Sequence, residues 1–383
     1  MTSLLVIFVL VLIGIAVWQL TKIFDLTQVG EITDDSGVAN DRDNSVNGYL
    51  MFGFLGFIYL FTIYSLIAWG EFVLGTPASE HGVEVDNLME ISMWLIFFVQ
   101  TVTQFLLHYY TFKYRGKEGQ KALYFADNNK LEAAWTIIPV IVLAVLILYG
   151  LYTWNQIMYY DDEEDVMYVE LYAKQFGWQA RYAGDDNTLG KANVRYIEGI
   201  NTVGVDLEDP NAQDDKVVSE LHLPKGKKVV FKIRSQDVLH SAFMPHFRAQ
   251  MNCVPGMVTQ FAFVPTITTA EMRQNEAIIF KVNKINKIRA NKSIDLVANG
   301  QAALDPYTFD YLLLCNKICG ASHYNMQMKI VVDSPSDYKK WLAEQPTLSS
   351  QWKEANAPKV EEVKEKATET IVDSTKVIAQ VIK

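Results

Sequence analysis

The residues best suited to chemistry lie close together towards the end of the chain. Within twelve positions the sequence places Cys315, Cys319, His323 and Met326, and a further histidine, His240, stands upstream in the segment Ser-Gln-Asp-Val-Leu-His-Ser. Thiolate and thioether sulfur are soft ligands that select copper, and imidazole also suits it, whereas magnesium, calcium and manganese prefer oxygen ligands. The spacing therefore predicts a site for a soft metal.

Two other interpretations of these residues stay open. Cys315 and Cys319 could form a disulfide if their domain lies outside the cytoplasm. With His240 and His323, the same cysteines could hold a tetrahedral zinc ion. Met326 favours copper over zinc, because copper often takes a thioether as a weak axial ligand. A second cysteine close to the first would also let two thiolates bridge two coppers.

The motif resembles that of a known family. His-Ser after Asp-Val-Leu, followed by Cys-x-x-x-Cys-Gly-x-x-His-x-x-Met, is similar to subunit II of haem–copper cytochrome c oxidases, and the similarity covers about residues 87–345. It implies a dinuclear copper A centre. The implied ligands are the bridging thiolates of Cys315 and Cys319, the imidazoles of His240 and His323, the thioether of Met326 and the backbone carbonyl of Lys317.

The resemblance also implies a function and partners. The chain would accept electrons from cytochrome c and pass them to the haem–copper subunit I of a proton-translocating oxidoreductase, which reduces oxygen to water; subunit III is a further expected partner. No Cys-x-x-Cys-His segment occurs, so no haem is expected in this chain. An alternative of another class is a membrane-anchored assembly protein that binds copper or zinc without electron-transfer turnover.

Lys317 departs from the family pattern. Most members have a glutamate between the two cysteines, and its carboxylate helps to hold a magnesium or manganese ion at the interface with the catalytic subunit. A lysine can still offer its backbone carbonyl to copper, but its side chain carries donors and no acceptor. The magnesium or manganese site is therefore expected to be absent or altered.

Apolar residues are concentrated in the first 155 positions. Four runs there approach the about 20 residues needed to cross a hydrocarbon core about 30 Å thick. They cover residues 4–20, 49–69, 93–110 and 133–152. A signal peptide is the alternative for the first run, but this run lacks a positive flank and a small-residue cleavage site. The last two runs resemble the two membrane helices of the family, and the first two have no counterpart there.

The loop charges predict the orientation of these runs. The loops around residues 21–48 and 113–130 carry Lys and Arg, whereas residues 71–90 carry none. The positive-inside rule then places the first and third loops in the cytoplasm of a bacterium and both termini in the periplasm. The formal net charge is −10. Nucleic acid is not an expected partner, whereas acidic patches could steer a basic cytochrome c.

The sequence predicts four parts: two extra membrane helices (1–75), the membrane hairpin of the family (87–155), a copper A domain (160–335) and a polar, helix-prone tail (336–383). Short apolar segments separated by turns predict a β-sandwich or barrel in the third part. With the copper ligands on loops at one end, an all-β cupredoxin-like Greek-key sandwich is expected. The expected strands cover residues 167–172, 217–223, 228–233, 258–264, 277–282, 294–298, 307–314 and 326–332.

Three further residues have a role implied by the resemblance. Phe176 and Trp178 lie in an aromatic segment similar to the family's electron inlet, and Trp178 is the preferred candidate; packing within the sheet is the alternative. Glu132 matches a glutamate at the entrance of a proton pathway into the catalytic subunit. Its alternative role is that of a carboxylate at a helix start, where the helix dipole favours it.

Overall fold

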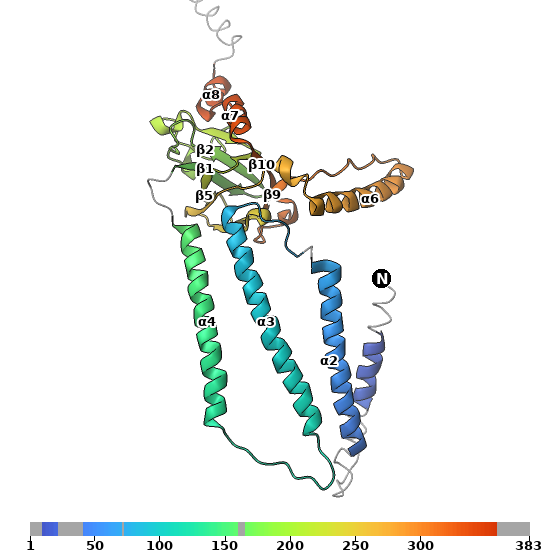
Figure 1. The fold of residues 1–383 in the computed structure, drawn as a ribbon. Helices are drawn as coiled ribbons and strands as arrows, with labels where there is room; N and C mark the ends of the chain where they lie inside the picture. Colours follow the sequence, from blue (N-terminus) through green and yellow to red (C-terminus); the bar gives the residue numbers. More distant parts are fainter. Residues whose placement is uncertain (1–9, 22–40, 71–72, 160–164, 358–383) are drawn as a thin grey trace, which may run out of the picture. The chain divides into compact units, whose positions relative to one another are not determined.

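The protein is described here by a computed structural model covering residues 10–21, 41–70, 73–159 and 165–357 (Figure 1). It divides into two compact units. The first unit contains residues up to Glu71 together with Trp94–Trp135, and the second contains Phe72–Met93 together with the chain from Thr136 onwards. The two long helices that begin at Glu80 and Asn129 therefore each contribute to both units.

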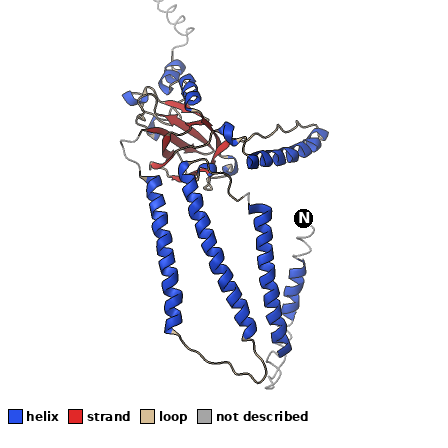
Figure 2. Ribbon diagram, in the orientation of Figure 1, coloured by secondary structure: helices blue, strands red, loops and turns tan. Residues whose placement is uncertain are grey.

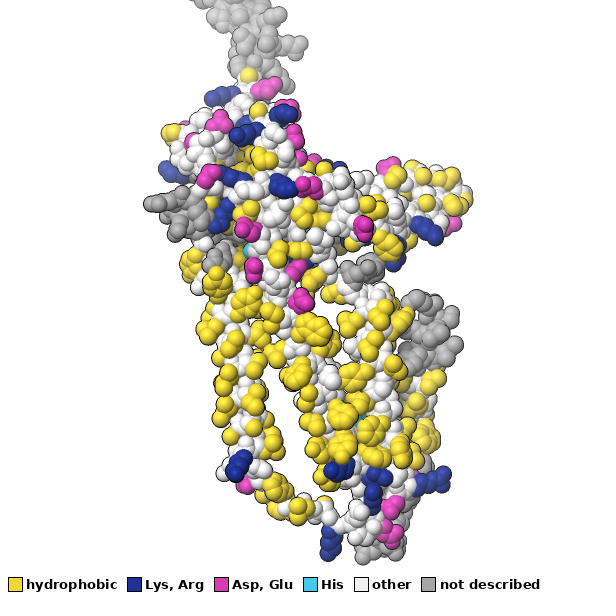
Figure 3. All heavy atoms as spheres, viewed as in Figure 1, with side chains coloured by type: hydrophobic (Ala, Val, Ile, Leu, Met, Phe, Trp, Pro, Cys, Tyr) yellow, Lys and Arg dark blue, Asp and Glu magenta, His cyan; other side chains and the backbone are white. Residues whose placement is uncertain are grey.

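Three helices within the described residues are long and apolar enough to cross a membrane: α2 (Asp41–Trp69), α3 (Glu80–Lys113) and α4 (Asn129–Met158). Their outward side chains are largely hydrophobic (Figure 3). The last three predicted runs lie inside these helices and are confirmed. Of the first run, only a shorter apolar helix at Leu10–Thr21 is described, so a fourth spanning helix stays a prediction.

Helix α2, which contains the second predicted apolar run, packs closely on α3 within the first unit. A Cβ added at Gly48 would come within 2.6 Å of the Phe112 ring. The Arg115 guanidinium lies 4.1 Å from the centroid of the same ring and donates to the Phe112 carbonyl. A small residue at this position lets the two helices approach closely, and a larger one would displace the Phe112 ring.

Ten strands form a two-sheet sandwich in the second unit (Figure 2). The first sheet has the order β3 (Lys216–Val218), β2 (Gly177–Tyr182), β1 (Val166–Lys174), β5 (Lys228–Ser235) and β8 (Thr259–Phe263). The second has the order β4 (Leu221–Pro224), β10 (Gln327–Asp333), β9 (Tyr311–Cys315), β6 (His240–Met244) and β7 (Ala249–Cys253). The short helices are α5 (Thr269–Met272), η2 (Val194–Tyr196), η3 (Pro210–Ala212), η4 (Pro245–Phe247) and η5 (His323–Asn325).

The core of the sandwich follows the period of two that strands impose. Leu171 on β1, Phe231 on β5, Tyr311 and Leu313 on β9, and Ile330 on β10 are completely buried and share one hydrophobic cluster. The β-sandwich expected from the short apolar segments is thereby confirmed. Such a core holds the ends of the strands in place, and it thereby restrains the loops that connect them.

Two predicted strands are wrong. Residues 277–282 and 294–298 belong to one helix, α6 (Glu276–Ala298), which begins after an Asn275 cap. Short runs rich in Ile and Val cannot be assigned to strand or helix by composition. The decisive signal was the helical spacing of Ile278, Val282 and Ile285, which are partly or fully buried. The predicted strand at 217–223 is also divided, into β3 and β4.

The chain after the sandwich is helical at least as far as α8. Helices α7 (Pro335–Glu344) and α8 (Leu348–Ala355) follow β10. Trp341 of α7 stacks on His222 with 3.9 Å between the ring centroids, and Tyr338 is buried against the core. The beginning of the predicted tail is therefore part of the folded domain, and the tail beyond residue 357 lies outside the described residues.

Candidate metal centre

The predicted ligands come from one end of the second sheet. His240 opens β6 and Cys315 closes β9, and these strands pair so that Ala242 lies opposite Cys315. Cys319 lies in the loop that follows, His323 opens η5, and Met326 directly precedes β10. Strand pairing thus joins a histidine and a cysteine that are 75 residues apart.

The donor atoms of these residues form a continuous cluster. Cys315 Sγ lies 3.7 Å from His240 Nδ1, 3.8 Å from Cys319 Sγ and 3.2 Å from the Lys317 carbonyl oxygen. Cys319 Sγ lies 3.7 Å from His323 Nδ1 and 3.8 Å from Met326 Sδ. The cluster therefore has two halves, and each contains one thiol, one imidazole and one weaker donor.

The thiols are free, and the geometry does not support a disulfide. The 3.8 Å between the sulfurs of Cys315 and Cys319 is far longer than the about 2.05 Å of an S–S bond. Burial and the Cys315 thiol raise the pKa of Cys319 to about 11. Two adjacent thiolates therefore need a compensating cation, which is the chemistry that a bound soft metal provides.

Asp237 orients the first histidine, and sequence reasoning missed it. The ring of His240 is fully buried, with Nδ1 towards Cys315 and Nε2 2.9 Å from an Asp237 carboxylate oxygen. Asp237 also accepts hydrogen bonds from the backbone N–H groups of Val238 and Gln175. A carboxylate on one ring nitrogen leaves the other available to a metal. The available signal was an acidic residue three positions before the histidine.

Two family models match the chain. They are the transmembrane domain of cytochrome c oxidase subunit II, over residues 55–153, and its periplasmic domain, over residues 167–278. The alternative cytochrome c oxidase subunit 2 of Bradyrhizobium diazoefficiens is 33% identical over 276 residues, or 72% of this chain and 84% of that protein. The chain belongs to the cytochrome c oxidase subunit II family.

More distant relatives have the same name. Cytochrome c oxidase subunit 2 of Thermostichus vulcanus is 22% identical over 335 residues, or 81% of this chain and 88% of that protein. The periplasmic domain of subunit II from Bradyrhizobium japonicum aligns with 47% of this chain and 93% of its own, at 16% identity and a TM-score of 0.26.

As a subunit II, the chain is part of a bacterial oxidoreductase complex, with a membrane anchor and a periplasmic domain. The periplasmic match contains His240 but ends at residue 278, shortly after α6 begins. The loop that carries Cys315, Cys319, His323 and Met326 comes after α6 and lies outside this match. The ligand assignment for that loop therefore depends on its own motif and geometry.

The two aromatic candidates both approach the cluster. The Trp178 ring lies 6.2 Å from the His240 ring, edge to face, and is 5% exposed. Phe176 is 41% exposed and packs over Gly320, where an added Cβ would come within 2.9 Å of its ring. Gly320 has φ +138°, which disfavours any other residue. Trp178 is therefore close to a predicted ligand, but little of it is open to a partner protein.

Two other residues lie outside the predicted ligand set. Cys253 is fully buried in the core, and burial raises the pKa of its thiol to about 12. It lies opposite His240 in the pairing of β6 and β7. Glu132 lies in the first turn of α4, where Asn128 caps the helix by accepting from the Leu131 N–H. This position fits the helix-start role that the sequence allowed.

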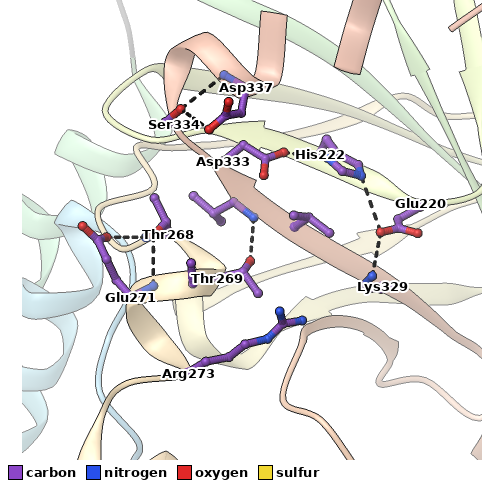
Figure 4. Close-up of a pocket in the computed structure, with 13 residues that line it drawn as sticks. Glu220, His222, Thr268, Thr269, Glu271, Arg273, Lys329, Asp333, Ser334 and Asp337 are labelled. Carbon is purple, nitrogen blue, oxygen red and sulfur yellow. Dashed lines mark hydrogen bonds and ion pairs between the residues drawn. The ribbon is translucent and has the colours of Figure 1, made fainter. Parts of the chain in front are cut away.

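A polar hollow of about 530 Å³ opens elsewhere on the domain (Figure 4). His222 Nδ1 lies 2.7 Å from an Asp333 oxygen, and Lys329 donates to Glu220 over 2.9 Å. The residues that line the hollow come from α5, β4, β10 and the start of α7, and none of the predicted ligands is among them. The charged groups of the hollow are engaged in ion pairs, either with one another or with residues outside the lining, as Glu271 is with Lys225 and Arg273 with Asp310, so we assign it a structural role.

Proposed function

We propose that His240, Cys315, Cys319, His323, Met326 and the Lys317 carbonyl hold a dinuclear copper A centre. The observation that supports this most directly is the division of the donors into two halves that meet at the paired thiols. When bound, two thiolate-bridged coppers would supply a one-electron acceptor. The chain's own residues hold the donors in place: the sandwich fixes both strands, and Asp237 orients His240.

Zinc is the competing metal, and it would favour the alternative function of a metal-binding assembly protein. Zinc would use four of these donors and leave Met326 without a role. Metal analysis and electron paramagnetic resonance of the purified full-length chain separate the two. We expect two coppers sharing one unpaired electron. One zinc, or one isolated cupric ion, per chain would contradict a copper A centre.

In this proposal cytochrome c delivers electrons near Trp178 and Phe176, and subunit I receives them for oxygen reduction and proton pumping. Subunit III is a further partner, and the apolar helices lie in the lipid bilayer. Glu132 lies at the mouth of a proton pathway. Both termini are on the periplasmic side. The proposed parts are the extra helices (1–75), the family hairpin (87–155), the copper domain (160–335) and the tail (336–383).

A Trp178→Leu variant is expected to oxidise cytochrome c about tenfold or more slowly while retaining its copper. The reason is that the indole is the aromatic group next to the buried His240. The measurement is the steady-state rate of cytochrome c oxidation together with copper per enzyme. Phe176→Leu serves for comparison, because Phe176 contacts the cysteine loop at Gly320 instead. A normal rate in the Trp178 variant would remove it from the path.

Because residue 317 is a lysine, this chain is expected to lack the magnesium or manganese ion that the family holds at the interface with the catalytic subunit. Enzyme from cells grown with manganese is expected to show no Mn²⁺ bound at this position, because an ammonium cannot ligate it. A Lys317→Glu variant restores a carboxylate and is expected to bind about one Mn²⁺ per enzyme. Electron paramagnetic resonance of Mn²⁺ measures both. Lys317→Gln is the control, and a Mn²⁺ signal in the unaltered enzyme would refute the prediction.

A further inference from the structure

Helix α6 and the segment that follows it, residues 299–310, form an arm (the orange helix in Figure 1). The returning segment runs back along one side of the helix. Asn286 and Tyr307 exchange two hydrogen bonds, of 3.1 and 2.7 Å, and Ser293 accepts from the Leu304 N–H over 2.9 Å. A helix of 23 residues is about 35 Å long, so the arm is long enough to reach a neighbouring molecule.

The arm has exposed apolar side chains on opposite sides. Ile279 and Val297 are 44% and 58% exposed, and eighteen residues, or five helical turns, place them on the same side. Ile288 is 61% exposed and stands nine residues from each, which places it on the opposite side. Phe280 and Ile294 are 54% and 69% exposed. Helices that are apolar all round are buried in protein or in a membrane, and apolar residues on opposite sides of α6 would need cover on more than one side.

The arm is basic in an otherwise acidic chain. Helix α6 contains five Lys or Arg and two Asp or Glu, a net charge of +3, whereas the chain has −10, so the remainder has −13. Among the residues that the structure describes, Lys281, Lys287 and Lys292 form no salt bridge. Figure 3 shows Lys and Arg side chains beside hydrophobic ones on the visible face of this helix. A complementary surface is therefore acidic as well as apolar.

The base of the arm lies above the membrane. The Asn275 amide donates to Thr76 Oγ1 over 3.2 Å, close to where α3 begins at Glu80. Acidic residues continue along α3 to Glu90, so the hydrocarbon core begins no earlier than Ile91, about 16 Å further along the helix. A headgroup layer is only about 5–8 Å thick. A bilayer would also cover one side of the arm and not both.

We propose that this arm docks on an acidic and apolar protein surface of another subunit of the oxidase, outside the membrane. The proposal rests on the chain being subunit II of an assembled enzyme. The partner surface covers the arm on both sides, so that Ile279, Ile288 and Ile294 become buried in the contact, and the lysines between them pair with carboxylates of the partner. Charge complementarity of this kind selects the partner and orients it.

Hydrogen exchange of the α6 amides tests the proposal. We would compare the purified oxidase with the full-length chain alone, both in nanodiscs of phosphatidylcholine with or without phosphatidylglycerol. Exchange is expected to be at least about tenfold slower in the assembled oxidase, in both lipids. Equal exchange in the two preparations overturns the docking. Slow exchange of the isolated chain that requires phosphatidylglycerol also overturns it, because the arm then binds a lipid surface.

Charge reversal gives a second, independent measurement. Lys287→Glu combined with Lys292→Glu is expected to lose about tenfold or more of the protection in the assembled oxidase. The matched control is Lys339→Glu with Lys353→Glu, on exposed positions of α7 and α8. Equal losses in both pairs would overturn the proposal. Absence of the copper-pair signal from the unaltered chain would instead count against the proposed function. Failure of the docking proposal and failure of the proposed function are therefore distinguishable.

Discussion

A Cys319→Ser variant is expected to lose the dinuclear centre. Cys319 is the donor that contacts the other thiol, His323 and Met326, so its loss disconnects one half of the cluster from the other. A hydroxyl is a hard, weak ligand for copper, and the affinity is expected to fall by at least about 100-fold. Copper per chain and the paramagnetic signal of the copper pair measure this, and cytochrome c oxidation should stop.

The third cysteine provides a matched control. Cys253 is buried near the same ligands but is not expected to bind metal. A Cys253→Ala variant should therefore keep two coppers, with at most a modest loss of stability from the small cavity. If Cys253→Ala loses copper while Cys319→Ser keeps it, the ligand assignment is wrong.

The largest effect on stability is expected from Glu170→Gln. Glu170 is 3% exposed and accepts hydrogen bonds from the guanidiniums of both Arg181 and Arg234. Arg181 also donates to the buried Asp215 over 2.8 Å. The variant would leave the buried Arg181 with Asp215 alone and the partly buried Arg234 without a carboxylate partner, and such losses cost about 3–5 kcal/mol. The thermal midpoint of the copper domain in the full-length chain should fall by about 10 °C.

The stabilisation that Glu170 provides is expected to depend on pH. Burial alone would raise the pKa of Glu170, but the two guanidiniums outweigh burial and hold the pKa below its ordinary value of 4.5. A depressed folded pKa means that the stabilisation is complete above the unfolded pKa and is lost as the pH falls through the folded pKa. The difference between Glu170→Gln and the unaltered chain should therefore be full at pH 7 and shrink below about pH 4.

An exposed ion pair is the control for Glu170. Glu220 accepts from Lys329 over 2.9 Å, and both side chains are 41% exposed. Solvent screens such pairs, so Glu220→Gln is expected to cost less than about 1 kcal/mol. If the two variants are equally stable, the buried network contributes no more than a surface pair, and the argument from burial fails.

Helix α6 shows where local sequence patterns were insufficient. Its first and last turns are rich in Ile and Val, and residues 277–282 and 294–298 were predicted as strands for that reason. Whether such a run forms a strand depends on a neighbouring strand that can pair with it, and this is a tertiary property. The polar residues between the two runs, with the Asn275 cap, form a continuous helix instead.

The sequence by itself determined the chemistry of the candidate site. Two thiols, an imidazole and a thioether at this spacing select a soft metal, because ligand softness belongs to the side chains. Only the tertiary structure brought His240 to Cys315, since the pairing of β6 with β9 joins distant parts of the chain. It also decided that Asp237 orients the imidazole, that Trp178 is buried beside it, and that α6 extends as an arm. These are properties of packing, which no local pattern encodes.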